Sequence, residues 1–437
     1  MVFSPNHLSA LGRADLRSTG FVIGVAALVL LVSLAPAASA LVLVTDLGTL
    51  GGFHASALGI NNLGQVVGSA QTASDESHAF LWYDGRMIDI NVFDSRDSVA
   101  FSINDLGQVV GWARTPSDLF HAFLWEHGQV TDLNPETATQ SIAYDINVAG
   151  QVAGGVFELY WRAVTWSGGE MIPLTPPGIS SSAAAINDQG QIVGVFSPGD
   201  GFTHGFLWED GILRDLGTFG GYAVVPRDIN NLGQIVGYYV PMSLGSRSFL
   251  WDDGTVTDLG IGVEGELGYA AAINDAGEVA GLMTVCEGKV CYTHAGLWEA
   301  GDVVDLGTLG GTYSESRDIN EFGEIVGLSY DSTNLLVRAA LWKVTTGSDV
   351  SGPLVVAVED LVERGAFGEA QGRALLSSLG AVARQVDQDN ACGAIRLLDA
   401  FIRQVGAFET AGFLASGDAL ALSDEAHAAI DSLSSSC

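Results

Sequence analysis

The sequence predicts a chain built mostly of β-strands, with a small helical region at its end. Seven asparagines that follow an isoleucine and seven tryptophans that end an apolar run form two series, and both series advance by 40 to 47 residues. Each interval holds four short apolar runs separated by turn residues, which is the period and content of one β-propeller blade. We therefore predict an all-β fold, a seven-bladed β-propeller over residues 41–345, followed by a small α-helical domain.

We number the repeats 1 to 7 by these residues. The asparagines are Asn61, Asn104, Asn147, Asn187, Asn230, Asn274 and Asn320, and the tryptophans are Trp82, Trp125, Trp166, Trp208, Trp251, Trp298 and Trp342. Repeat 1 has a turn at Asn61–Gly64, where Asn and Gly both tolerate positive φ. In its third run Phe80 and Trp82 alternate with other apolar residues. Such a strand is apolar on both faces, which predicts that the aromatic side chains pack between neighbouring blades.

The ends of the repeat array predict how it closes. An Asp-Leu-like run follows the tryptophan in the other repeats but is missing after Trp342, while one such run, Val42–Leu47, precedes repeat 1. We expect Val42–Leu47 to be the fourth strand of repeat 7, because this pairing removes exposed strand edges. A solenoid is the alternative, but it would need polar capping repeats, and none is evident.

The N-terminus has the pattern of an export signal. Arg13 and Arg17 precede an apolar run over residues 21–34, and small residues surround Ala40. Residues 1–40 are therefore predicted to be a signal peptide, with the mature chain starting near Leu41. An uncleaved membrane anchor is the alternative, although the run is short for a bilayer. We expect a secreted or extracellular protein, with no membrane span after cleavage and with cell-surface association left open.

Composition restricts the partners. The chain has 51 acidic and 18 basic residues, a formal charge of -33. This charge argues against nucleic acid as a partner, because that binding requires cations to neutralise phosphates. No cofactor is expected. Calcium remains a candidate stabiliser on charge alone, since no loop has calcium-ligand spacing.

The repeats also resemble a known family. The strings His78–Trp82, His121–Trp125 and Asp46–Gly52 resemble the HAF family of extracellular repeats found in exported bacterial proteins. The resemblance covers residues 41–345. It implies the compartment and the fold, and it brings no established catalytic residues.

One position of the third run is basic in every repeat: His78, His121, Arg162, His204, Arg247, His294 and Arg338. The residue before each isoleucine is aspartate only in the three repeats that have arginine there. This match predicts ion pairs within a blade between Asp145 and Arg162, Asp228 and Arg247, and Asp318 and Arg338. A ring of basic groups that binds an anion or acidic glycan is the alternative. A metal site formed by these histidines is disfavoured, because they lie in separate blades.

Four cysteines in an exported chain predict disulfides. Cys286 and Cys291 bracket a loop tip at a spacing that can close a small ring. Cys392 and Cys437 can pair if the last two helices are antiparallel neighbours, which would help so small a bundle.

The composition changes after residue 345. Residues 346–352 are predicted to be a linker and residues 353–437 a small helical domain, with helices over 354–363, 369–385, 392–408 and 423–433. The run Leu397–Ile402 and the following Val405 resemble the FIMAH-type domain. That resemblance carries no known chemistry, so packing is the expected role of the apolar stripe, with partner binding as the alternative.

The sequence favours a binding protein over an enzyme. It lacks the short motifs of common hydrolases and nucleotide-binding sites. The connections between second and third runs vary in length and content, so we expect this loop face to bind an extracellular or cell-surface protein or glycan. Phe202, Tyr239 and Tyr330 are the candidate loop contacts. The alternatives are a polysaccharide hydrolase or lyase with carboxylates at the channel, and a structural surface or adhesion component.

Overall fold

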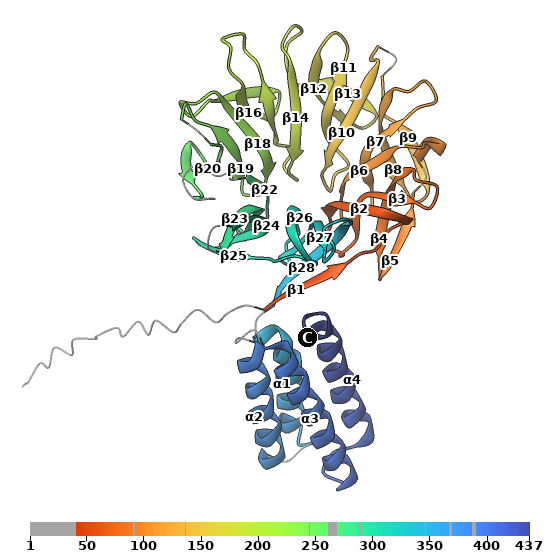
Figure 1. The fold of residues 1–437 in the computed structure, drawn as a ribbon, viewed down its shortest axis with the longest axis vertical. Coiled ribbons are helices and arrows are strands. Elements are labelled where there is room, and N and C mark those ends of the chain that lie inside the picture. Colours follow the sequence, from red (N-terminus) through yellow and green to blue (C-terminus); the bar gives the residue numbers. More distant parts are fainter. Residues whose placement is uncertain are drawn as a thin grey trace, which may run out of the picture. The chain divides into compact units, whose positions relative to one another are not determined.

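The computed structural model describes residues 41–437 except 91, 136, 244, 261–268, 288–289, 300, 346, 367–368 and 387–389. The predicted signal peptide, residues 1–40, lies outside the described residues. The β-region runs from β1 to β28, and it is followed by the helices α1 to α4 (Figure 1). A short 3-10 helix, η1 (Val92–Asp94), follows β5, and another, η2 (Ser434–Ser436), follows α4.

Five separate sheets have four strands each, in chain order, with antiparallel pairing between neighbours. These sheets correspond to repeats 1 to 5. Their strands are β2 (Gly51–Ile60), β3 (Val66–Thr72), β4 (Ser77–Tyr83), β5 (Arg86–Asp89), β6 (Ser98–Ile103), β7 (Val109–Arg114), β8 (Phe120–Glu126), β9 (Gln129–Asp132), β10 (Gln140–Ile146), β11 (Val152–Phe157), β12 (Trp161–Ser167), β13 (Glu170–Pro173), β14 (Ser181–Ile186), β15 (Ile192–Phe196), β16 (His204–Glu209), β17 (Ile212–Gly217), β18 (Ala223–Ile229), β19 (Ile235–Val240), β20 (Arg247–Asp252) and β21 (Thr255–Asp258).

The remaining eight strands form one sheet. They are β22 (Tyr269–Ile273), β23 (Val279–Glu287), β24 (Val290–Glu299), β25 (Asp302–Asp305), β26 (Gly310–Ile319), β27 (Glu324–Asp331), β28 (Val337–Thr345) and β1 (Leu41–Asp46). Strands β22–β25 pair with one another, as do β26–β28 with β1, and one parallel residue pair, Thr293 with Tyr313, joins the two groups. The predicted pairing of the N-terminal strand is confirmed, because β1 lies antiparallel to β28, from Leu41 opposite Thr345 to Asp46 opposite Ala340.

The asparagine of each repeat explains why the Ile-Asn turn recurs. In repeat 1 the Asn61 side-chain oxygen accepts hydrogen bonds from the backbone N–H groups of Leu63 and Gln65, which fixes the turn. Its side-chain nitrogen donates to the backbone oxygen of Asn104 in the next repeat at 3.0 Å. Equivalent bonds link every asparagine to the next one, and Asn320 donates to the Asn61 backbone oxygen. The seven asparagines therefore form a closed circle of hydrogen bonds.

The strands are arranged in a propeller-like way around this circle. Figure 1 shows the first strands, such as β6, β10, β14 and β18, nearest the centre, with third and fourth strands such as β9 and β20 toward the rim. Apolar side chains of neighbouring repeats pack together, as predicted. Phe80 of repeat 1, which is fully buried, belongs to one cluster with Val326 and Ala339 of repeat 7.

Each second strand carries a glycine where the first strand passes very close. A Cβ atom on Gly111 would lie 1.9 Å from the backbone oxygen of Val99, and Gly68 and Gly327 meet similar backbone atoms. No side chain fits at that distance, so the Val-Gly pair of the repeat is required by the backbone approach.

Four helices follow the β-region: α1 (Gly347–Glu363), α2 (Glu369–Val386), α3 (Ala391–Thr410) and α4 (Ser416–Leu433). The predicted linker 346–352 is mostly wrong, because α1 begins at Gly347 and includes Pro353 near its start. The last helix also begins seven residues before the predicted Ser423, at Ser416. The predicted stripe of α3 is confirmed, since Leu398, Phe401 and Val405 are fully buried.

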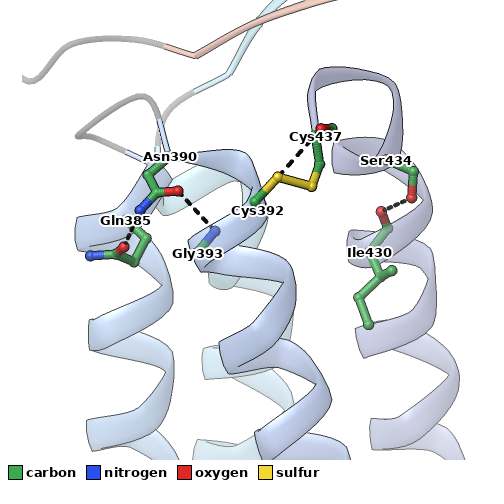
Figure 2. The surroundings of a disulfide bond; sticks show 7 residues. All are labelled: Gln385, Asn390, Cys392, Gly393, Ile430, Ser434 and Cys437. Atoms are coloured by element: carbon green, nitrogen blue, oxygen red, sulfur yellow. Dashed lines mark hydrogen bonds between the residues drawn. A yellow bond between two sulfur atoms is a disulfide. The ribbon is translucent and has the colours of Figure 1, made fainter.

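Both predicted disulfides are present, and the described residues contain no free cysteine. Cys286 and Cys291 lie opposite each other on β23 and β24. Figure 2 shows Cys392, at the start of α3, bonded to Cys437, the last residue of the chain, with Cα atoms 4.9 Å apart. Asn390 caps α3 by accepting a hydrogen bond from the Gly393 backbone N–H.

Candidate functional site

The first strand of every repeat contains a β-bulge at the same place, two residues before the isoleucine. A bulge leaves one residue without a partner on the neighbouring strand and redirects its side chain. The bulge residues are Leu58, Phe101, Tyr144, Ala184, Arg227, Ala271 and Arg317.

All seven bulge residues line one central cavity of about 320 Å³, together with Ser102, Asp145, Asp228 and Asp318. The lining residues of the first strands precede the Ile-Asn turns, so this cavity lies on the side of the asparagine circle that faces the variable loops. A second cavity of about 200 Å³ lies on the turn side and is lined by six of the seven asparagines and by the residues that follow the asparagines. We call the first of these the channel cavity.

Three aspartates at the base of the channel cavity join neighbouring repeats. Asp318 accepts hydrogen bonds from the backbone N–H groups of Ile319 and, in repeat 1, Ile60, at 2.9 and 2.8 Å. Asp228 does the same with Ile229 and Ile273. Asp145 joins repeats 3 and 4 by accepting from the N–H groups of its own and the next isoleucine, and it also accepts from the Ser102 hydroxyl.

The predicted pairing of these aspartates with Arg162, Arg247 and Arg338 is therefore wrong. Their carboxylates are directed to backbone N–H groups of two first strands, away from the third strands that carry those arginines. The next repeat has a small residue at the equivalent position, Ala185, Ala272 or Gly59, where another carboxylate would compete for the same N–H group. The alternation of aspartate with small residues thus reflects contact between repeats.

Burial raises the pKa of all three carboxyl groups. The pKa of Asp228 rises to about 7 and that of Asp318 to about 8, and that of Asp145 is also raised. Repulsion among the three adds to the effect of burial at Asp228 and Asp318, while the backbone N–H groups oppose it.

Two arginines bring positive charge into the channel cavity. One guanidinium nitrogen of Arg317 lies 2.6 Å from a carboxylate oxygen of Glu315, while its buried Nε has no hydrogen-bond partner among the described residues. The Arg227 guanidinium lies 5.4 Å from the centre of the Tyr269 ring, in cation–π contact. No carboxylate of the described residues forms an ion pair with Arg227.

Aromatic side chains accompany these arginines toward the loop side. Tyr269 stacks on Tyr238 with ring centres 5.2 Å apart, and burial raises its pKa. In repeat 7 the Tyr313 ring lies 5.3 Å from that of Tyr330, and its hydroxyl donates to Glu315. On the other side of the cavity, Tyr144 lies 5.4 Å from Phe101.

The basic residues of the third strands instead contact acceptors within their own repeats. Nδ1 of His78, His121, His204 and His294 lies 2.7 to 2.9 Å from an aspartate at or near the end of the fourth strand. Arg247 pairs with Asp258 in the same way, and Arg338 lies 3.7 Å from Asp46 of β1. Repeat 3 has Pro173 in place of that aspartate, and Arg162 donates to the backbone oxygen of Thr175. None of the seven basic residues lines the channel cavity, so the predicted alternative of an anion-binding ring at this position receives no support.

The candidate loop contacts divide into two kinds. Phe202 lies in the connection before β16, with its ring 6.3 Å from that of Tyr222. Tyr239 and Tyr330 are strand residues of β19 and β27, and each contacts another aromatic ring, so their placement in loops is wrong.

Sequence reasoning missed the bulge residues. Arg227 and Arg317 directly precede Asp228 and Asp318, and Tyr144 precedes Asp145, so an alignment of the repeats on isoleucine would have placed all of them in one column. Regular strand alternation would send adjacent side chains to opposite faces. Only the bulge allows both to reach the same cavity.

Among the described residues, no group of three His, Cys, Asp or Glu side chains is arranged to hold a metal ion. Within the same residues, no helix combines the length and apolarity required to cross a bilayer.

Comparison with known proteins identifies part of the chain. Residues 354–431 match the FIMAH domain, which agrees with the resemblance seen in the sequence of the helical region. No curated protein matches the chain.

Several solved β-structures resemble the chain. The β-propeller domain of the Trilobed protease from Pyrococcus furiosus is 14% identical, with a TM-score of 0.47, over 68% of this chain and 95% of that one. TolB from Acinetobacter baumannii is 12% identical, with a TM-score of 0.37, over 64% and 80%. A puromycin-hydrolyzing peptidase of Mycobacterium tuberculosis is 14% identical, with a TM-score of 0.41, over 66% of this chain and 53% of the peptidase.

Proposed function

We propose that this protein is an exported seven-bladed β-propeller that binds an extracellular glycan at the mouth of its channel cavity, on the loop face. The seven blades correspond to the five separate sheets and the two four-stranded groups of the eight-stranded sheet. Export is supported by the pattern of residues 1–40, by the resemblance to the HAF repeats and by the two disulfides.

The observation that carries this proposal is that all seven bulge residues line one cavity. A bulge costs one ladder hydrogen bond, and bulges are common beside binding sites. The cavity volume, about 320 Å³, lies at the lower end of the range of small-molecule sites. Tyrosine and arginine side chains around the cavity offer both flat ring faces and hydrogen-bond donors. This combination is better suited to binding a sugar ring than to binding the flat surface of a partner protein.

Catalysis is the less favoured function for the same cavity. A hydrolase needs a carboxylate free to act as acid, base or nucleophile, with a second carboxyl group about 5–10 Å away. Both oxygens of Asp145, Asp228 and Asp318 already accept backbone N–H groups that hold neighbouring repeats together. We therefore expect binding without turnover, which an assay for new reducing ends would test.

The direct experiment screens residues 41–437 on a glycan array, beside two variants. Ala184→Trp fills the channel cavity from a bulge position, and Leu106→Ala shortens an exposed side chain on the turn side. We expect the unaltered protein and Leu106→Ala to bind the same glycans and Ala184→Trp to lose them. Unchanged binding by a correctly folded Ala184→Trp protein, or capture of proteins but no glycans, would contradict the proposal.

A further inference from the structure

The channel cavity holds more hydrogen-bond donors than its own acceptors use. Arg227 is exposed and makes no ion pair with any described carboxylate, while the buried Nε of Arg317 has no described partner. A buried donor without a partner costs free energy, so a ligand that supplies an acceptor gains by binding there.

The two arginines line the same cavity. They occupy the same bulge position of repeats 5 and 7. Repeat 6, between them, contributes only the methyl group of Ala271 at this position, and repeat 4 contributes Ala184. The larger bulge residues Leu58 and Phe101 come from other repeats.

The surroundings favour a sugar that carries a carboxylate. Arginine presents donors in a planar fork that matches a carboxylate in two-point contact. Tyr144, which lines the cavity, supplies a ring face on which the C–H side of a sugar can pack. A neutral sugar would leave the Arg227 guanidinium without a carboxylate partner.

We propose that the channel cavity binds the carboxylate of a uronic-acid residue of a glycan, with Arg227 and Arg317 as the groups that recognise it. This inference rests on the proposed function, because it names the class of glycan bound at that same site. Different measurements test the proposed function and this inference. The proposed function requires that a glycan binds in the cavity. The inference requires that binding depends on the negative charge of that glycan.

The charged groups around the cavity give the proposal a direction with pH. The groups that face the arginines are Glu315, paired with Arg317, the three aspartates Asp145, Asp228 and Asp318, and the hydroxyls of Tyr144, Tyr269 and Tyr313. With pKa values of about 7 and about 8, Asp228 and Asp318 lose their negative charge as pH falls from 8.5 to 6. An anionic ligand must therefore bind more tightly at pH 6, with proton uptake, whereas a cationic ligand must bind more tightly at pH 8.5.

The experiment is calorimetric titration of residues 41–437 with an oligosaccharide of galacturonic acid and with its methyl ester, at pH 6 and pH 8.5. The ester keeps the sugar ring and removes the charge. Variants Arg227→Gln and Arg317→Gln remove one cation each, Arg317→Lys keeps the charge, and Arg162→Gln removes an arginine of the third strands. Thermal unfolding of each variant verifies that it is folded.

We expect the acid to bind, the ester and both glutamine variants to bind about 10- to 100-fold more weakly, and Arg162→Gln to bind as the unaltered protein does. Arg317→Lys should retain more affinity than Arg317→Gln, and affinity should rise from pH 8.5 to pH 6. Equal affinity for acid and ester, or tighter binding at pH 8.5, would overturn the inference while leaving glycan binding intact. If the protein binds neither compound and the glycan array shows binding to neutral glycans only, the inference is also overturned. If the array shows binding to no glycan at all, the proposed function is overturned as well.

Discussion

The first strands and the third and fourth strands of this protein use the same residue types in opposite ways. On the third and fourth strands, aspartates such as Asp89 and Asp305 pair with a histidine of their own sheet at the partly exposed surface. On the first strands, Asp228 and Asp318 accept backbone N–H groups of two different repeats, deep in the channel. The surface pairs close one sheet locally, whereas the channel aspartates hold the ring together. This difference shows that the role of an aspartate that recurs in the repeats depends on how deeply the side chain is buried and on which group it contacts.

Removal of a channel aspartate should have the largest effect. Asp318→Ala leaves the N–H groups of Ile60 and Ile319 without an acceptor, which we expect to lower the free energy of unfolding by about 2–4 kcal/mol. Asp89→Ala, at the surface, should cost less than about 1 kcal/mol. Urea unfolding of both variants measures the difference, and equal losses would refute the contrast.

The pH dependence of stability should differ in sign between the two regions. The folded-state pKa of Asp318, about 8, lies above its ordinary value of 3.8, so its contribution to stability is complete below about pH 4 and is lost as pH rises to about 8. Asp228 acts likewise up to about pH 7. At the surface, hydrogen bonds from His294 and Gly307 outweigh burial and lower the pKa of Asp305, so its contribution is present above pH 3.8 and lost below it.

Thermal unfolding between pH 5 and pH 8.5 tests this prediction. The channel aspartates should make the melting temperature fall across this range, and Asp228→Asn combined with Asp318→Asn should flatten the fall. Asp305→Asn serves as the surface control and should leave the slope unchanged. A double variant with the same slope as the unaltered protein would mean that the channel carboxylates do not take up protons on folding.

A surface pair should show a smaller coupling. Burial lowers the pKa of His204, but hydrogen bonds and attraction from Asp215 and Asp200 outweigh it, and the pKa is raised. The pair His204–Asp215 should therefore add less than about 1 kcal/mol below pH 6.5, and this contribution should vanish as pH rises through the raised pKa. A double-mutant cycle with His204→Gln and Asp215→Asn at pH 5.5 and pH 8.5 measures it. A coupling above about 2 kcal/mol would place this pair in the same class as the channel aspartates.

The smallest effect is expected where the surface pair is naturally missing. Pro173→Asp would give Arg162 the fourth-strand carboxylate that its equivalents Arg247 and Arg338 contact. Because exposed pairs contribute little, we expect a change within about 0.5 kcal/mol in the free energy of unfolding. Urea unfolding of this variant beside the unaltered protein is sufficient, and a large gain would show that these pairs matter more to stability than we infer.

The sequence predicted correctly the features that depend on a regular pattern or on the spacing of particular residues. The strand content, the pairing of β1 with β28, the asparagine turns, the two disulfides and the apolar stripe of α3 all follow from periodicity, turn chemistry or spacing. The start of α4 and the linker were misplaced, because Gly347–Pro353 and Ser416–Leu422 lack a strong helical pattern.

The channel could not be predicted in the same way. Strand periodicity assigns neighbouring residues to opposite faces, so Arg317 and Asp318 were not expected to share a cavity. The bulge that brings them together lies beside the close approach of two backbones at the second-strand glycine, and a periodic pattern does not reveal it. The alternation of aspartate with small residues was noticed in the sequence, but the partners of the aspartates are backbone N–H groups, which carry no residue identity, so the alternation was assigned to the wrong contact.

The most direct test of the division between channel and surface is a crystal structure of residues 41–437 with a bound galacturonic-acid oligosaccharide. We expect a sugar carboxylate in the channel cavity, within hydrogen-bond distance of Arg227 and Arg317, while the pairs such as His78 with Asp89 remain intact. A sugar bound to the histidines and arginines of the third strands, with the channel cavity empty, would contradict the assignment of recognition to the first strands.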